Sequence, residues 1–333
     1  MILNPYSITY LLLSALSLLL GIAALVAGIG VARAWQTCDS PERRYQLEKN
    51  VYLSMTLIAL GFCLRLVLVP LWFLMLQSLI PSIPGAMCLC GVHLLKPSYS
   101  FLSTLLKFIL PMVYGYWLAL NALDRKIETQ PLMTRKLYTL IPLNLLMFVE
   151  SFSDLHFLTA VKPRFVNCCS SLFDDSSSKL MQTMTYSGWA WVFVFFAMAG
   201  ASLIVAGYVL RRPRHPIGAL LGVLGPVTLI SFVLAVHTAL SPRFLQAQFH
   251  HCVFCVWQKL PDLIAVTAAI CLACWASVIY AATRSVLEYP GASVIADANA
   301  RRLLQWVMGS LLVGCGLLAA RIAAVNGLFG MGH

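Results

Sequence analysis

Residues 7–35 of the chain read SITYLLLSALSLLLGIAALVAGIGVARAW, and this stretch decides the class of fold. It carries no charged side chain before Arg33. About 20 consecutive apolar residues suffice for a helix to cross the hydrocarbon core of a bilayer. No basic segment precedes the stretch and no small-residue cleavage site interrupts it, so we expect an uncleaved first transmembrane helix rather than a signal peptide.

The same pattern recurs along the whole chain. Of its 333 residues, 60% are hydrophobic and 11% are charged, and its mean hydropathy is +0.83. Soluble domains are about 25% charged. The sequence therefore predicts an all-α, polytopic integral membrane helix bundle with about eight transmembrane helices. The predicted spans are Ser7–Trp35, Val51–Ile80, Leu102–Leu123, Leu137–Ala160, Trp189–Leu210, Ile217–Leu240, Leu263–Thr283 and Leu303–Val325.

The distribution of Lys and Arg predicts the orientation of these spans. The odd-numbered connections hold fourteen Lys and Arg residues and the even-numbered ones hold six. Basic residues collect in cytoplasmic connections, so we expect both termini to be extracytoplasmic, most simply in a bacterial inner membrane. The net charge of +11 has the same explanation, because no basic patch is interleaved with stacking aromatic residues as in proteins that bind nucleic acid.

This topology sorts the eleven cysteines. Three close pairs fall in the three even-numbered connections, on the extracytoplasmic side, where disulfides form and persist. These pairs are Cys88 and Cys90, Cys168 and Cys169, and Cys252 and Cys255. The first pair follows the second predicted span and the third pair follows the sixth, and all six thiols are candidates for redox chemistry.

One of the three pairs belongs to a longer motif, Cys252-Val253-Phe254-Cys255-Val256-Trp257-Gln258-Lys259, which follows His250 and His251. A C-x-x-C pair is a common redox element, and nearby positive charge favours the thiolate. The motif resembles the Cys-Val-Leu-Cys-Ile-Tyr-Glu-Arg-type loop of the DsbB family, membrane proteins that pass electrons from disulfide formation to quinone. The resemblance implies that Cys252 and Cys255 are the quinone-side redox pair. It also implies that Lys259 helps to hold the quinone, with Lys in place of the usual Arg.

Other functions fit the same cysteines. Disulfides between the outer loops could brace a transporter, a permease or a subunit of a membrane complex, or the outer pairs could exchange thiols with Cys252, Cys255 and an extracytoplasmic thiol protein. Thiolate and imidazole groups also suit soft metals. A metal-handling membrane protein is therefore a third hypothesis. The spacing matches no known zinc or haem motif, and we assign no metal ligand. Of these readings, the sequence favours a thiol–disulfide oxidoreductase.

Ionisable residues inside the predicted spans are the remaining functional candidates, since such groups are costly in lipid unless paired. They are Arg65, Glu150, Asp154 and Arg321, with Lys107 and His237 nearer the outer ends. Arg65 and Glu150 both lie near mid-span, and we expect them to pair, either structurally or in proton movement or at a quinone headgroup. The chain forms one transmembrane domain, 1–333. A duplication would divide it into four-helix halves, 1–160 and 189–333, joined by an extracytoplasmic loop with cysteines.

Overall fold

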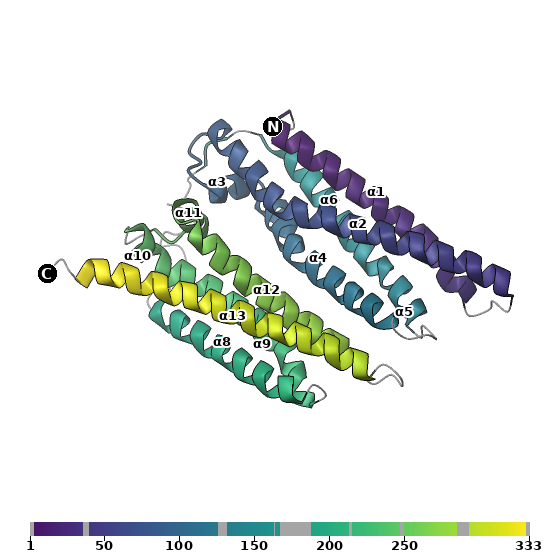
Figure 1. Cartoon of the computed structure of the whole chain (residues 1–333). Helices are drawn as coiled ribbons and strands as arrows, with labels where there is room; N and C mark the ends of the chain where they lie inside the picture. Colours follow the sequence, from purple (N-terminus) through teal and green to yellow (C-terminus); the bar gives the residue numbers. More distant parts are fainter. Residues whose placement is uncertain are drawn as a thin grey trace. The chain divides into compact units, whose positions relative to one another are not determined.

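The computed structural model describes residues 3–35, 40–125, 132–162, 164–166, 188–212, 215–246, 250–284 and 293–330. Over these residues all regular secondary structure is helical, as expected (Figure 1). The chain divides into two compact units, Met1–Val166 and Asn167–His333, here called unit 1 and unit 2. The predicted halves, 1–160 and 189–333, fall within these units, and an internal duplication stays a prediction.

The described residues of unit 1 form four long helices and three short ones. They are α1 (Pro5–Trp35), α2 (Pro41–Leu79), η1 (Ile80–Ser82), α3 (Leu89–Leu94), α4 (Pro97–Asp124), α5 (Met133–Tyr138) and α6 (Leu140–Ala160). Proline is the first residue of α2 and of α4, a position where its missing N–H costs no hydrogen bond. α1 packs against α2 and α6, and α4 packs against α6 (Figure 1).

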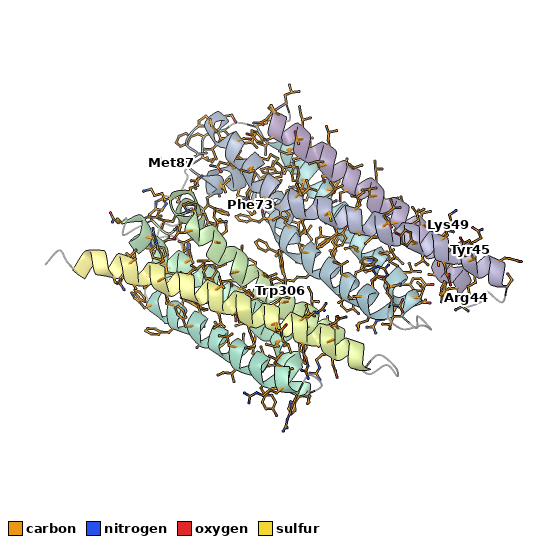
Figure 2. The ribbon with its side chains drawn as sticks, viewed as in Figure 1. Arg44, Tyr45, Lys49, Phe73, Met87 and Trp306 are labelled. Carbon is orange, nitrogen blue, oxygen red and sulfur yellow. The ribbon has the colours of Figure 1, made fainter. Side chains whose placement is uncertain are left out.

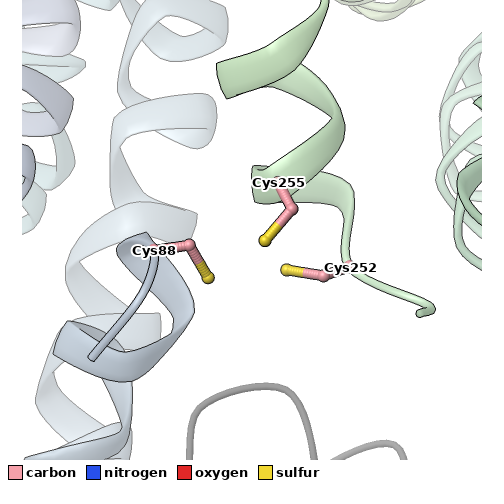
Figure 3. A group of neighbouring side chains, drawn as sticks. All are labelled: Cys88, Cys252 and Cys255. Carbon is pink, nitrogen blue, oxygen red and sulfur yellow. The ribbon is translucent and has the colours of Figure 1, made fainter. Parts of the chain in front are cut away.

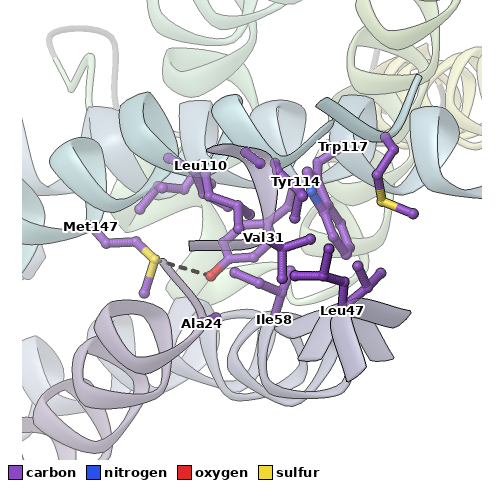
Figure 4. Close-up of a cluster of buried hydrophobic side chains, with 14 residues drawn as sticks. Ala24, Val31, Leu47, Ile58, Leu110, Tyr114, Trp117 and Met147 are labelled. Atoms are coloured by element: carbon purple, nitrogen blue, oxygen red, sulfur yellow. Dashed lines mark hydrogen bonds between the residues drawn. The ribbon is translucent and has the colours of Figure 1, made fainter. Parts of the chain in front are cut away.

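The hydrophobic core of unit 1 lies where these long helices meet (Figure 4). Tyr114 and Trp117 of α4 are each 1% exposed, and the Tyr114 hydroxyl donates a hydrogen bond to Met147 Sδ at 3.1 Å. Next to this core, a buried ion pair fixes α5, because Lys136 Nζ lies 2.6 Å from Asp124 Oδ2.

Unit 2 has a similar order of long helices with short ones between them. They are α8 (Gly188–Arg211), η2 (Pro216–Leu220), α9 (Leu221–Ala235), η3 (Val236–Leu240), α10 (Ser241–Leu245), α11 (Val253–Lys259), α12 (Asp262–Thr283) and α13 (Ser293–Gly330). η3 is a π-helix that continues from α9. α9 and α12 approach closely, since a Cβ on Gly225 would lie 2.8 Å from Ser277 Cβ. Small residues permit such close packing of membrane helices.

Seven helices of the described chain are long and apolar enough to cross a membrane. They correspond to every predicted span except Leu137–Ala160. That segment begins with α5, breaks at Thr139 and continues as α6, whose polar residues Asn144, Glu150 and Asp154 face inward. Large apolar side chains point outward on both units; Phe193 and Ile204, for example, are 72% and 74% exposed. Exposed apolar surface of this extent is typical of contact with lipid, and the chain is an integral membrane protein.

The length of α2 is consistent with this setting. Its 39 residues span about 58 Å at about 1.5 Å per residue, whereas the hydrocarbon core is about 30 Å thick. Arg44, Tyr45 and Lys49 lie at its N-terminal end (Figure 2). This polar end of α2 therefore extends beyond the apolar layer.

Candidate functional site

The C-x-x-C pair lies at the start of α11 in unit 2. Cys252 is the N-cap residue of this helix and Cys255 is in its first turn. The side chains point toward one another (Figure 3), with the two Sγ atoms within 4.8 Å. Cys252 is 1% exposed, whereas Cys255 is partly exposed. The pair therefore has one buried sulfur and one that a reactant can reach.

Hydrogen bonds and packing fix α11 in this position. The Cys252 carbonyl accepts the first bond of the helix from Val256 N at 3.2 Å, and Val256 is buried in the core of unit 2. Trp257 Nε1 donates to Thr267 Oγ1 of α12 at 3.1 Å. The chain then turns at Pro261 into α12. The cysteine pair is thus held rigidly at the end of a spanning helix.

The charged and imidazole groups predicted to surround the pair lie in the same segment. Lys259 is four residues after Cys255, so both lie on one face of α11, and Lys259 is exposed. His251 is 6% exposed, and its Nδ1 lies 3.0 Å from the carbonyl oxygen of His237. His250 is partly buried. The sequence placed His237 near the outer end of a predicted span, and in the structure this residue contacts His251 from the π-helix η3.

The C-x-C pair lies in unit 1, in the connection between α2 and α4. Cys88 is the N-cap residue of α3 and Cys90 is in its first turn, and both are buried. His93 of α3 hydrogen-bonds to Ser100 and stacks on Phe101, with ring centroids 5.2 Å apart. Burial lowers the pKa of His93 to about 4. The predicted sites at Cys168 and Cys169 lie outside the described residues.

A network of four buried charges occupies the interior of unit 1. Glu150 accepts a hydrogen bond from Arg65 through Oε2, and its Oε1 lies 3.1 Å from Lys107 Nζ. Lys107 Nζ also lies 3.0 Å and 3.1 Å from the two carboxylate oxygens of Asp154. None of the four side chains is more than 3% exposed. Two cations and two carboxylates balance one another, which offsets the cost of burying each charge. The expected Arg65–Glu150 pair is present.

Polar and aromatic groups complete this network. Asp154 accepts hydrogen bonds from the hydroxyls of Tyr10 and Ser103. Arg65 donates through Nε to Ser17 Oγ at 2.8 Å, and the Lys107 ammonium lies 4.2 Å from the ring centroid of Trp72. Lys107 thus belongs to the network, although its position in the sequence suggested an outer-end residue. The spacing of Glu150 and Asp154 was a signal for a second cation in the network. Two carboxylates on one helix face carry two negative charges, and Arg65 balances only one of them.

Arg321 does not belong to a buried site, contrary to the prediction. Its Nε lies 3.7 Å from Asp262 Oδ2, with the two side chains 33% and 53% exposed. The residue is close to the end of α13, where a long side chain reaches the polar boundary. Among the described residues, all buried Lys, Arg, Asp and Glu side chains lie in unit 1. The two units therefore carry different chemistry: balanced charges in unit 1 and the C-x-x-C pair in unit 2.

Comparisons of the chain with protein-family models, with curated proteins and with solved structures give no match.

Proposed function

We propose that the chain is a membrane thiol–disulfide oxidoreductase whose redox pair is Cys252 and Cys255. The separation of their sulfur atoms, within 4.8 Å at the start of α11, carries this proposal. An S–S bond is about 2.05 Å long, so rotation of the two cysteine side chains at the start of α11 suffices to close it. The same two residues then alternate between a dithiol and a disulfide.

The proposed reaction has two halves. The disulfide form accepts two electrons from an extracytoplasmic thiol protein, whose own two cysteines become a disulfide. The dithiol form then loses two protons and two electrons to a quinone, which becomes a hydroquinone. Cys255 is the more exposed sulfur, so it reacts with the partner, and Cys252 closes the pair. Lys259, which shares a helix face with Cys255, supplies positive charge at the quinone headgroup. His250 and His251 are assigned to the same headgroup site.

This reaction needs the cysteine-bearing connections on the extracytoplasmic side. The excess of Lys and Arg in the odd-numbered connections supports that orientation. We therefore propose a bacterial inner-membrane protein with α6 as an eighth span and with both termini outside. Thiol exchange that involves Cys88, Cys90, Cys168 or Cys169, and a structural role for them in disulfides, stay predictions from the sequence.

Quinone-dependent oxidation of the reduced protein tests the proposal. The protein is reduced, reconstituted in liposomes and mixed with a short-chain quinone, and each cysteine is then quantified by alkylation and mass spectrometry. Cys252 and Cys255 should lose reactivity together, and Cys252→Ser should leave Cys255 in the thiol form. Cys271 and Cys274 of α12 have the same spacing but are buried in mid-helix, and they should not change. Unchanged reactivity of Cys252 and Cys255 after quinone addition would refute the quinone-linked reaction.

The buried network in unit 1 favours a second candidate, a permease coupled to proton movement. Ionisable groups inside a membrane bundle are costly and often belong to proton pathways. Liposomes loaded with a pH-sensitive dye test this function. The intact protein should move protons faster than empty liposomes do, and Glu150→Asp, which keeps the charge but shortens the side chain, should slow the movement. Equal rates for protein and empty liposomes would make the network purely structural.

A further inference from the structure

An open groove lies between α12 and α13 of unit 2. Its volume is about 580 Å³, within the range of about 300–1,000 Å³ that is typical of ligand sites. Leu272 of α12 and Trp306 of α13 (Figure 2) are among the residues that line it, and they are 37% and 60% exposed. None of the described residues that line the groove belongs to the cysteine pair of α11. The groove is therefore a separate feature of this unit.

The α13 wall of the groove is a single stripe along the helix. Its residues Arg302, Trp306, Gly309 and Val313 lie three or four positions apart, so they share one face. From Arg302 to Val313 the stripe is about 16 Å long, at about 1.5 Å per residue. Half of a hydrocarbon core of about 30 Å is about 15 Å. The groove therefore has the length of one leaflet of a bilayer.

The two ends of this stripe differ in polarity. Residues 303–320 contain no charged side chain, so Arg302, which directly precedes them, lies at the boundary of the apolar layer. At the other end, Val313 adjoins a close approach of the two helices, since a Cβ on Gly314 would lie 2.9 Å from Ile270 Cδ1 of α12. The groove thus has a cation at its mouth and an apolar inner end.

Charge and space along the groove suit an anionic lipid. Arg302 is exposed, and within the described part of the chain its guanidinium forms no ion pair or hydrogen bond. The described lining residues include no carboxylate, and Gln305 adds an amide that can donate to phosphate oxygens. At Gly309 a Cβ would meet no atom within 4 Å. An acyl chain can therefore pass over this glycine.

We propose that the groove binds one anionic phospholipid, with its phosphate at Arg302 and Gln305 and an acyl chain along Gly309 toward Val313. The cation at the mouth, the apolar walls and the length of one leaflet all fit this class of ligand. A zwitterionic phospholipid has the same chains but no net charge, so Arg302 favours the anionic one by a factor of about five. The site goes beyond the proposed redox function and does not depend on it.

Quenching of Trp306 by brominated lipids tests this site, because bromine on an acyl chain quenches a tryptophan that it contacts. The full-length protein is reconstituted in phosphatidylcholine liposomes with increasing fractions of brominated phosphatidylglycerol, or of brominated phosphatidylcholine with the same chains. The emission of Trp306 is the difference between the intact protein and Trp306→Phe. Half-quenching should need about fivefold less brominated phosphatidylglycerol than brominated phosphatidylcholine.

Two matched pairs of variants locate the lipid. Arg302→Gln should remove the preference for phosphatidylglycerol. Arg301→Gln removes the same charge from the preceding position, which does not line the groove, and should keep the preference. Gly309→Leu should fill the groove and also remove the preference. Gly316→Leu should keep it, because this glycine of α13 also faces open space but lies outside the groove.

Three results would overturn the proposal. Equal half-quenching by the two lipids would show that the groove does not select an anionic headgroup. An equal loss of preference in Arg301→Gln and Arg302→Gln would show general attraction to a basic surface. Displacement of the brominated lipid by an equimolar short-chain quinone would make the groove a quinone site.

A second measurement applies if Trp306→Phe does not fold. The intact protein is mixed with equal amounts of the two lipids in detergent and analysed by native mass spectrometry. Retention of one phosphatidylglycerol, in about fivefold excess over phosphatidylcholine, is expected. Equal retention of the two lipids would refute the site.

Discussion

Replacement of Glu150 by glutamine should destabilise unit 1 strongly. Glu150 is the carboxylate that contacts both cations of the network, Arg65 and Lys107. Its replacement leaves those two cations with Asp154 as the one carboxylate in the network. Removal of one member of a buried ion pair typically costs about 3–5 kcal/mol. At about 2–4 °C per kcal/mol, this corresponds to a fall of roughly 6–20 °C in the thermal midpoint.

The assay is thermal unfolding of the purified protein in detergent, followed by the exposure of buried cysteines. A matched control is Asp262→Asn, because the Asp262–Arg321 pair is longer, at 3.7 Å, and partly exposed. Exposed pairs contribute about 0–1 kcal/mol. The double variant Arg65→Met with Glu150→Met restores charge balance and should be more stable than Glu150→Gln. A Glu150→Gln midpoint as high as that of Asp262→Asn would refute the reasoning that the network stabilises the fold.

Three further predictions concern other parts of the two units. Gly85 has φ of +81°, and a Cβ there would lie 2.3 Å from the Val166 carbonyl oxygen, so Gly85→Ala should lower the thermal midpoint and the yield of folded protein. His93 has a folded-state pKa of about 4, below its usual 6.5, because of burial. Its contribution to stability is complete above pH 6.5 and is lost as the pH falls toward 4, by up to about 3 kcal/mol; His93→Gln should flatten this part of the pH–stability curve. Gly225→Leu should separate α9 from α12, because a Cβ already meets Ser277 at 2.8 Å, and should lower the thermal midpoint more than Gly200→Leu, where a Cβ meets open space.

The long apolar helices could be predicted from the sequence because lipid imposes both their length and their composition. Seven of the eight predicted spans have counterparts among the membrane-capable helices of the described chain. α6 is less apolar because Glu150 and Asp154 face the interior of unit 1. Hydropathy sums all faces of a helix, and it cannot tell an inward carboxylate from an exposed one.

The buried charges were predictable in part. Arg65 and Glu150 stood out because each is an ionisable residue in mid-span. Tyr10, Ser17 and Ser103 gave no comparable signal, since tyrosine and serine are common in membrane helices. Their contacts with the network depend on the rotation of α1 and α4 about their axes, which the sequence pattern does not fix.

At the cysteine site, contacts between residues close in the sequence were predictable, whereas contacts between residues far apart in the sequence were not. The spacing of Cys252 and Cys255 already indicated that their sulfurs could meet, because residues three apart lie on one face of a helix turn. The placement of His237 against His251, which precedes the pair, depends on the π-helix η3 and on a contact across 14 residues. No short motif encodes that contact.

A redox titration of Cys252 and Cys255 tests the central claim most directly. The purified protein is equilibrated with mixtures of reduced and oxidised dithiothreitol, trapped with acid, alkylated and analysed by mass spectrometry. The account predicts that the two thiols disappear together and reversibly, with a tenfold change in the dithiol-to-disulfide ratio for about 30 mV, as for a two-electron couple. Independent behaviour of the two thiols, or a pair that stays fully reduced or fully oxidised at every ratio, would contradict it.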